Sequence, residues 1–151
     1  MSKFMSAANV FLDLDIKSRE EMLEFLSRKA VELGLADSVK ETLSAFKFRE
    51  EEGTTGLTNG FAIPHAKDKV IKSAGVVVAC TKEPMDWPSF DDQPVDICIA
   101  LYVPEIEAGT THLKLLSQTA VLLMKEEFRE AVRRPADPAA IAMLINEGLE
   151  G

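Results

Sequence analysis

The sequence predicts a single layered α/β domain in which helices cover a β-sheet. Its 151 residues are 46% hydrophobic and 28% charged, which is enough apolar material for one globular core. Segments with strand and helix patterns are interspersed along the chain, and no internal repeat or low-complexity linker separates them. The connection lengths allow a parallel sheet as readily as a mixed one. We expect one domain over residues 1–151, with a mixed sheet flanked by helices on both faces.

The first third of the chain predicts one strand and two helices. Apolar and polar residues alternate over 10–16, as in a strand with one buried face. Ser18 and Ser38 are each followed three residues later by a glutamate, and this pair of residues is typical of a capped helix start. We expect the second helix to end near Arg49 or Glu50, before the glycines that follow.

The middle of the chain predicts three strands. Residues 61–64 form a short apolar stretch, which its proline should end or keep at a sheet edge. Residues 75–80 and 95–103 are apolar runs of strand length, and the second is apolar enough to be covered on both faces. Residues 83–94 hold three of the seven prolines, so we expect a loop there.

The last third predicts three helices. Thr110 or Thr111 can cap a long helix, and a short helix should end before Pro135. Asp137 followed by Pro138 indicates the start of a third helix.

Charge and hydropathy exclude several classes of protein. The formal net charge is -8, whereas a nucleic-acid binder needs a basic face to displace counterions from phosphates. The apolar runs are far too short to cross a bilayer as helices, and no secretory signal opens the chain. We therefore expect a soluble, cytoplasmic protein that binds no nucleic acid.

The two cysteines, Cys80 and Cys98, lie inside apolar runs and lack a close-spaced partner of the kind that zinc sites use. Buried free thiols are the favoured interpretation, and a disulfide between neighbouring strands is the alternative. We expect neither a metal nor a cofactor.

The residues with the most suggestive chemistry are the only two histidines, His65 and His112. Both fall at the boundaries of predicted elements, where we expect a side chain to reach solvent and a partner. His112 lies in the first turn of a predicted helix, whose backbone N–H groups can hold an anion. Imidazole has an ordinary pKa of about 6.5 and is largely neutral near pH 7, so a histidine can accept a phosphoryl group without a dedicated base.

Arg49 and the pair Thr54 and Thr55 are candidate phosphate-binding residues. A guanidinium group matches the geometry of phosphate oxygens, and the hydroxyls of the glycine-flanked threonines can also donate to them. The alternatives are a helix C-terminal cation for Arg49 and a turn shaped by the two threonines. The acidic run 50–52 is most simply a solvated helix end that also attracts a basic partner.

Three stretches resemble the active-site region of a known family. They are Phe48 to Gly56, Asn59 to His65, and Thr111 to Leu116. Together they resemble fructose/mannitol-type EIIA domains of the bacterial phosphoenolpyruvate-dependent sugar phosphotransferase system, over nearly the whole chain. Ala66 stands where many members carry glycine, and Asp68 adds a negative charge beside the histidine.

The resemblance implies a phosphotransferase role and names its residues and partners. His65 would be phosphorylated through Nε2, with Arg49 and His112 contacting the phosphoryl group. Phosphorylated HPr would be the donor. A cysteine of an EIIB domain would be the acceptor, and it would pass the group to a sugar entering through a membrane EIIC protein. We expect the chain to act as a separate subunit.

Two other functions are weighed beside this one. A regulatory protein of the nitrogen-related type would use the same phosphorylation as a signal. A metal-dependent hydrolase would need both histidines together with a carboxylate such as Asp68 or Asp86, but no two of these residues have the spacing that puts ligands on one helix face. An EIIB-like role for Cys80 is set aside, because no glycine-containing anion loop follows it.

Overall fold

The computed structural model describes residues 4–107, 113–134 and 137–150. Its sheet contains β1 (Val10–Leu14), β2 (Phe61–Ala62), β3 (His65–Asp68), β4 (Gly75–Met85) and β5 (Val95–Pro104). The strand order is β1-β4-β5-β2, and β3 pairs with β5 further along the same edge as β2. The pair β4 and β5 is antiparallel, whereas β1 runs parallel to β4 and both β2 and β3 run parallel to β5. The sheet is therefore mixed, as expected.

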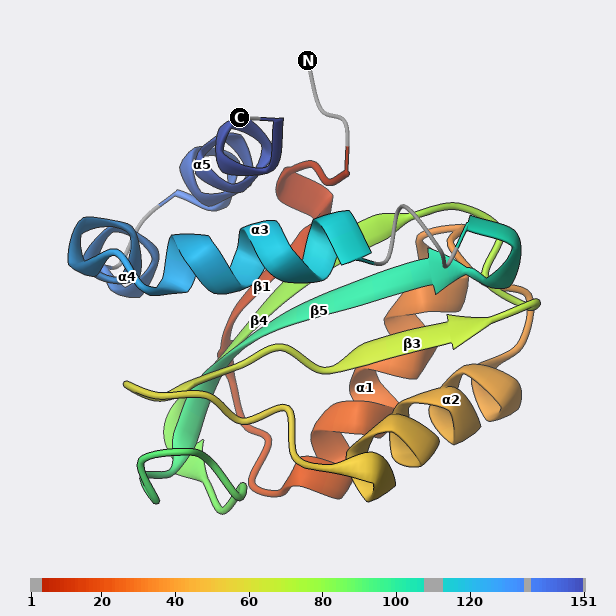
Figure 1. The fold of residues 1–151 in the computed structure, drawn as a ribbon, viewed down its shortest axis with the longest axis horizontal. Helices are drawn as coiled ribbons and strands as arrows, with labels where there is room; N and C mark the ends of the chain where they lie inside the picture. Colours follow the sequence, from red (N-terminus) through yellow and green to blue (C-terminus); the bar gives the residue numbers. More distant parts are fainter. Residues whose placement is uncertain (1–3, 108–112, 135–136, 151) are drawn as a thin grey trace.

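Helices cover both faces of the sheet (Figure 1). One face carries α1 (Arg19–Glu32) and α2 (Val39–Glu52), and the other carries α3 (Leu113–Leu123), α4 (Glu126–Arg133) and α5 (Pro138–Glu150). Short 3-10 helices, η1 (Ala7–Asn9) and η2 (Glu105–Glu107), precede β1 and follow β5. None of the helices among the described residues is long and apolar enough to cross a membrane.

The central strand β5 shows why the sheet is covered on both sides. Its residues alternate between two apolar cores, because successive side chains of a strand point to opposite faces. Ile97, Ile99 and Leu101 pack beneath α3, α4 and α5. Cys98 and Tyr102 pack beneath α1 and α2. The prediction of a strand buried on both faces is confirmed.

The predicted helix starts in the first third are also confirmed. The hydroxyl oxygen of Ser18 accepts from the backbone N–H of Glu21 at 3.1 Å, and that of Ser38 accepts from the N–H of Glu41 at 3.1 Å. Helix α2 continues two residues beyond the expected Glu50. The predicted caps at Thr110 and Thr111 lie outside the described residues.

Two segments differ from the prediction. Strand β4 continues to Met85, which pairs with Val95, so the loop expected from residue 83 begins later. Pro84 lies where the register of this pair shifts, so its missing N–H removes no regular ladder bond. Strand β3 was not predicted, because Pro64 indicated a strand end. The carbonyl oxygen of Pro64 nevertheless accepts from the N–H of Leu101, and pairing with β5 resumes at once.

Tyr102, the single tyrosine, provides a test of the core beneath α1 and α2. Its side chain is fully buried, its hydroxyl donates to the carbonyl oxygen of Leu26 at 2.7 Å, and burial raises its pKa well above the usual value. We expect no phenolate absorbance from the folded protein at pH values above about 10, where an unfolded tyrosine ionises. Ultraviolet titration, with circular dichroism to monitor folding, measures this.

The same group should make the fold alkali-sensitive. Above about pH 10 the unfolded chain releases the Tyr102 proton and the folded chain keeps it, so the free energy of unfolding should fall as pH rises. Tyr102→Phe should decline less steeply over that range in denaturant titrations. An equal decline would show that the tyrosine is not the cause.

Candidate functional site

The imidazole of His65, the first residue of β3, is held at both nitrogens. Nδ1 lies 3.0 Å from the carbonyl oxygen of Ile63, and Arg49 donates from Nε to Nε2 at 3.0 Å. A carbonyl oxygen can only accept, so Nδ1 must carry the ring hydrogen. A guanidinium N–H can only donate, so Nε2 must carry the lone pair. The contacts therefore select the neutral tautomer whose nucleophilic nitrogen is Nε2.

The expectation that His65 reaches solvent is wrong. The residue is only 2% exposed, and Arg49, near the C-terminal end of α2, places its Nε next to the ring nitrogen Nε2. Arg49 is itself steadied by donation from Nη1 to the carbonyl oxygen of Gly53 at 2.7 Å. In this arrangement the guanidinium covers Nε2, so a reagent can reach the lone pair only when Arg49 moves aside.

The two threonine hydroxyls have protein acceptors. Thr54 donates from Oγ1 to the carbonyl oxygen of Pro88 at 2.5 Å, and Thr55, which is 3% exposed, donates to Glu50. Gly56 lies so close to the backbone of Pro88 that a Cβ added to the glycine would be 2.1 Å from the Pro88 carbonyl oxygen. These contacts favour the second interpretation of the threonines, in which they shape the turn between α2 and β2.

Glu50 is buried at the end of α2, which was not predicted from the sequence. It was assigned to a solvated helix end, which holds for the exposed Glu51 and Glu52 but is wrong for Glu50, whose side chain is 4% exposed. Its carboxylate accepts from the N–H of Thr55 at 3.2 Å and from the Thr55 hydroxyl. The spacing of residues along the helix could have predicted this burial. Thr42, Phe46 and Glu50 follow one another at intervals of four residues, so they lie on the same buried face of α2.

The other predicted site residues are placed as follows. His112 lies outside the described residues. Ala66 is fully buried, and its φ is not positive. An alanine at this position, where many family members carry glycine, therefore causes no backbone strain. Asp68 accepts from the N–H of Val70 at 3.0 Å, so one carboxylate oxygen is engaged in a turn next to β3.

The two cysteines carry free thiols, Cys80 half-buried and Cys98 buried. Burial is the main cause that raises the pKa of Cys80 to about 12. Neither thiol therefore has the thiolate character of a phosphoryl-accepting cysteine. Within the described ranges, no three histidine, cysteine, aspartate or glutamate side chains gather closely enough to hold a metal ion.

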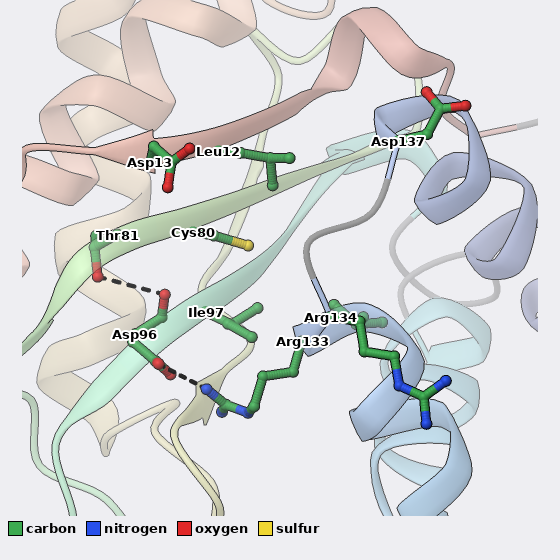
Figure 2. Close-up of a pocket in the computed structure, with 10 residues that line it drawn as sticks. Leu12, Asp13, Cys80, Thr81, Asp96, Ile97, Arg133, Arg134 and Asp137 are labelled. Carbon is green, nitrogen blue, oxygen red and sulfur yellow. Dashed lines mark hydrogen bonds and ion pairs between the residues drawn. The ribbon is translucent and has the colours of Figure 1, made fainter.

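A cavity of about 520 Å³ lies around Cys80 and Arg133 (Figure 2). Neither His65 nor Arg49 lines it. Arg133 reaches from the end of α4 to Asp96 on β5, with a 2.6 Å contact between Nη1 and Oδ2, and Nη2 donates to the carbonyl oxygen of Asn59 at 2.6 Å. Arg133 thus secures the turn that leads into β2, and the cavity lies apart from the histidine site.

Fold and site together define an α/β domain that holds a neutral histidine beneath an arginine at the edge of a mixed sheet. Residues 3–148 match the family model described as "Phosphoenolpyruvate-dependent sugar phosphotransferase system, EIIA 2". The chain belongs to this family.

Curated relatives include sugar-specific components of the phosphotransferase system and a nitrogen regulatory protein. The fructose-specific EIIA component of Haloferax volcanii is 32% identical, over 88% of this chain and 86% of that protein. The nitrogen regulatory protein of Bradyrhizobium diazoefficiens is 34% identical, over 87% of this chain and 85% of that protein. The 2-O-alpha-mannosyl-D-glycerate-specific EIIABC component of Escherichia coli is 32% identical over 90% of this chain, which spans only 21% of that longer protein.

Solved structures have the same fold. Nitrogen regulatory protein IIA-Ntr from Neisseria meningitidis aligns with a TM-score of 0.85 and 27% identity, over 92% of this chain and 94% of that one. Enzyme IIA-mannitol of Escherichia coli, in its complex with phosphorylated enzyme IIB-mannitol, aligns with a TM-score of 0.78 and 19% identity. That alignment covers 93% of this chain and 96% of the other, and it supports the fold alone.

The cover over His65 can be tested by chemical modification. Arg49→Met removes the guanidinium and keeps an apolar stem, so Nε2 should react several-fold faster with diethyl pyrocarbonate. Peptide mass mapping separates modification of His65 from that of His112. Lys47→Met, which removes an exposed charge from the same helix, is the matched control and should react as the unmodified sequence does. Equal rates in both variants would show that Arg49 does not shield the ring.

Proposed function

We propose that the chain is a cytoplasmic phosphoryl carrier of a sugar phosphotransferase system. It accepts a phosphoryl group from phosphorylated HPr on Nε2 of His65 and transfers it to a cysteine of an EIIB partner, which serves sugar uptake through a membrane EIIC protein. The observation that carries this proposal is the pair of hydrogen bonds that leaves the lone pair of a neutral imidazole on Nε2, directly beside a guanidinium group.

Acceptance begins when Arg49 leaves Nε2. The Nε2 lone pair then attacks the donor's phosphorus, a P–N bond forms, and the bond between phosphorus and the donor breaks with its electron pair staying on the donor. Nδ1–H keeps its hydrogen bond to Ile63, which offsets the positive charge that develops on the ring. Arg49 pairs with the phosphoryl oxygens, because its planar donors suit them.

Transfer reverses these steps. A thiolate of the acceptor attacks phosphorus, an S–P bond forms, and the P–N bond breaks so that the electron pair returns to Nε2. His112 is assigned, by resemblance to the family, as a second donor to the phosphoryl oxygens. The EIIB partner is proposed from membership of the EIIA family, one of whose members, enzyme IIA-mannitol, was solved in complex with phosphorylated enzyme IIB-mannitol.

Phosphoryl transfer in a purified system tests the histidines. Incubation with phosphoenolpyruvate, enzyme I and HPr should label the chain with an acid-labile, base-stable phosphate. His65→Ala should abolish the label because it removes the nucleophile. His112→Ala should keep the label but slow its appearance roughly a hundredfold, as expected for the loss of one transition-state donor. Normal labelling of His65→Ala would refute the assignment.

A regulatory role of the nitrogen type is the second candidate. It is favoured by the likeness to nitrogen regulatory proteins, one of them 34% identical over 87% of this chain. Such a protein would be phosphorylated on His65 by the same chemistry, but its output would be binding to a kinase or a potassium transporter.

The two roles are separated by following the label. If the chain is a carrier, its phosphate should move rapidly to purified EIIB from the same genome. EIIB whose active cysteine is changed to serine should stay unlabelled. Retention of the label in the presence of EIIB, together with binding of the unphosphorylated chain to a kinase or a potassium transporter, would instead establish the regulatory role.

A further inference from the structure

Glu50, which follows Arg49 in the chain, is a buried charged group. Its carboxylate accepts from the N–H and the hydroxyl of Thr55, and Arg19 of α1 lies 3.8 Å away. A buried carboxylate is costly unless hydrogen bonds and a countercharge offset its loss of water. Thr55, in the loop after α2, supplies the hydrogen bonds, and Arg19, on α1, supplies the countercharge.

A chain of hydrogen bonds leads from Glu50 to the ring of His65. Glu50 holds Thr55, whose carbonyl oxygen accepts from the N–H of Ile63 at 3.0 Å. The carbonyl oxygen of Ile63 in turn accepts from Nδ1 of His65 at 3.0 Å. The position of that carbonyl decides which ring nitrogen carries the hydrogen. The residues that hold the carbonyl in place therefore also keep the reactive lone pair on Nε2.

The ring is therefore held at both nitrogens by successive residues of one helix. Arg49 acts directly on Nε2, and Glu50 acts on Nδ1 through Thr55 and Ile63. We infer that Glu50 is a positioning residue, which keeps the lone pair of His65 on Nε2 by anchoring the loop whose carbonyl takes the Nδ1 hydrogen. The consequence for phosphoryl transfer rests on the proposed function, whereas the consequence for the tautomer does not.

The decisive measurement is the ¹⁵N chemical shift of each ring nitrogen of His65, which differs between a protonated nitrogen and one with a lone pair. In the unmodified chain the shifts should show hydrogen on Nδ1 and a lone pair on Nε2. Glu50→Ala should give a mixture of the two tautomers. Glu50→Gln should restore the original pattern, because its amide oxygen still accepts from Thr55 N–H and its NH₂ group can donate to the Thr55 hydroxyl.

Kinetics provide the second readout. Glu50→Ala should lower kcat for phosphorylation by phosphorylated HPr about tenfold and leave KM nearly unchanged, because the buried carboxylate has no contact with a docked partner. Glu41→Ala is the matched control, since it removes an exposed carboxylate from the other end of the same helix. Thr55→Val, which deletes one hydroxyl and keeps the backbone bonds, should shift the tautomers in the same direction to a smaller extent.

Each outcome bears on the inference. Ring shifts and kcat in Glu50→Ala equal to those of Glu41→Ala would overturn the inference. If Glu50→Ala does not fold, Thr55→Val decides, and unchanged His65 shifts in that variant would overturn the inference. If the unmodified chain accepts no phosphoryl group, the proposed function fails, while the tautomer measurement still tests Glu50 independently.

Discussion

The structure of this site depends on one constraint, the opposed hydrogen bonding of the two nitrogens of His65. A carbonyl oxygen faces Nδ1 and a guanidinium N–H faces Nε2, and only one uncharged tautomer satisfies both. The ring is 2% exposed, so both nitrogens face protein groups and not bulk water. The burial that hides the ring also makes its protonation pattern well defined, and this pattern places the nucleophilic lone pair beside a cation.

The fold brings these partners together from separate elements. Strand β3 lies at the edge of the sheet and pairs with β5, so a side chain at its start is within reach of the end of α2. The loop after α2 is held against Pro88 by Thr54 and by the close approach of Gly56. The glycine and threonines therefore serve the site by shaping its loop.

Membership of the EIIA family does not by itself choose between the two proposed roles, because a fructose-specific EIIA component and a nitrogen regulatory protein are both among the relatives. The hydrogen bonds around His65 suit either of the proposed roles, because both would use the same imidazole and guanidinium. The two roles would differ in the partner that docks on the domain.

The sequence by itself determined the layered α/β class and both serine-capped helices, because capping and periodicity are local properties of the chain. That Arg49 and His65 share a site was an expectation from the family resemblance, and only the structure shows the hydrogen bond between them. Strand β3 and the continuation of β4 past Pro84 came only from the tertiary structure, since strand pairing depends on a distant partner, β5. Burial also required the fold. Glu50 and Glu51 are the same residue type on the same helix, and only packing against α1 and the Thr55 loop makes one of them part of the site.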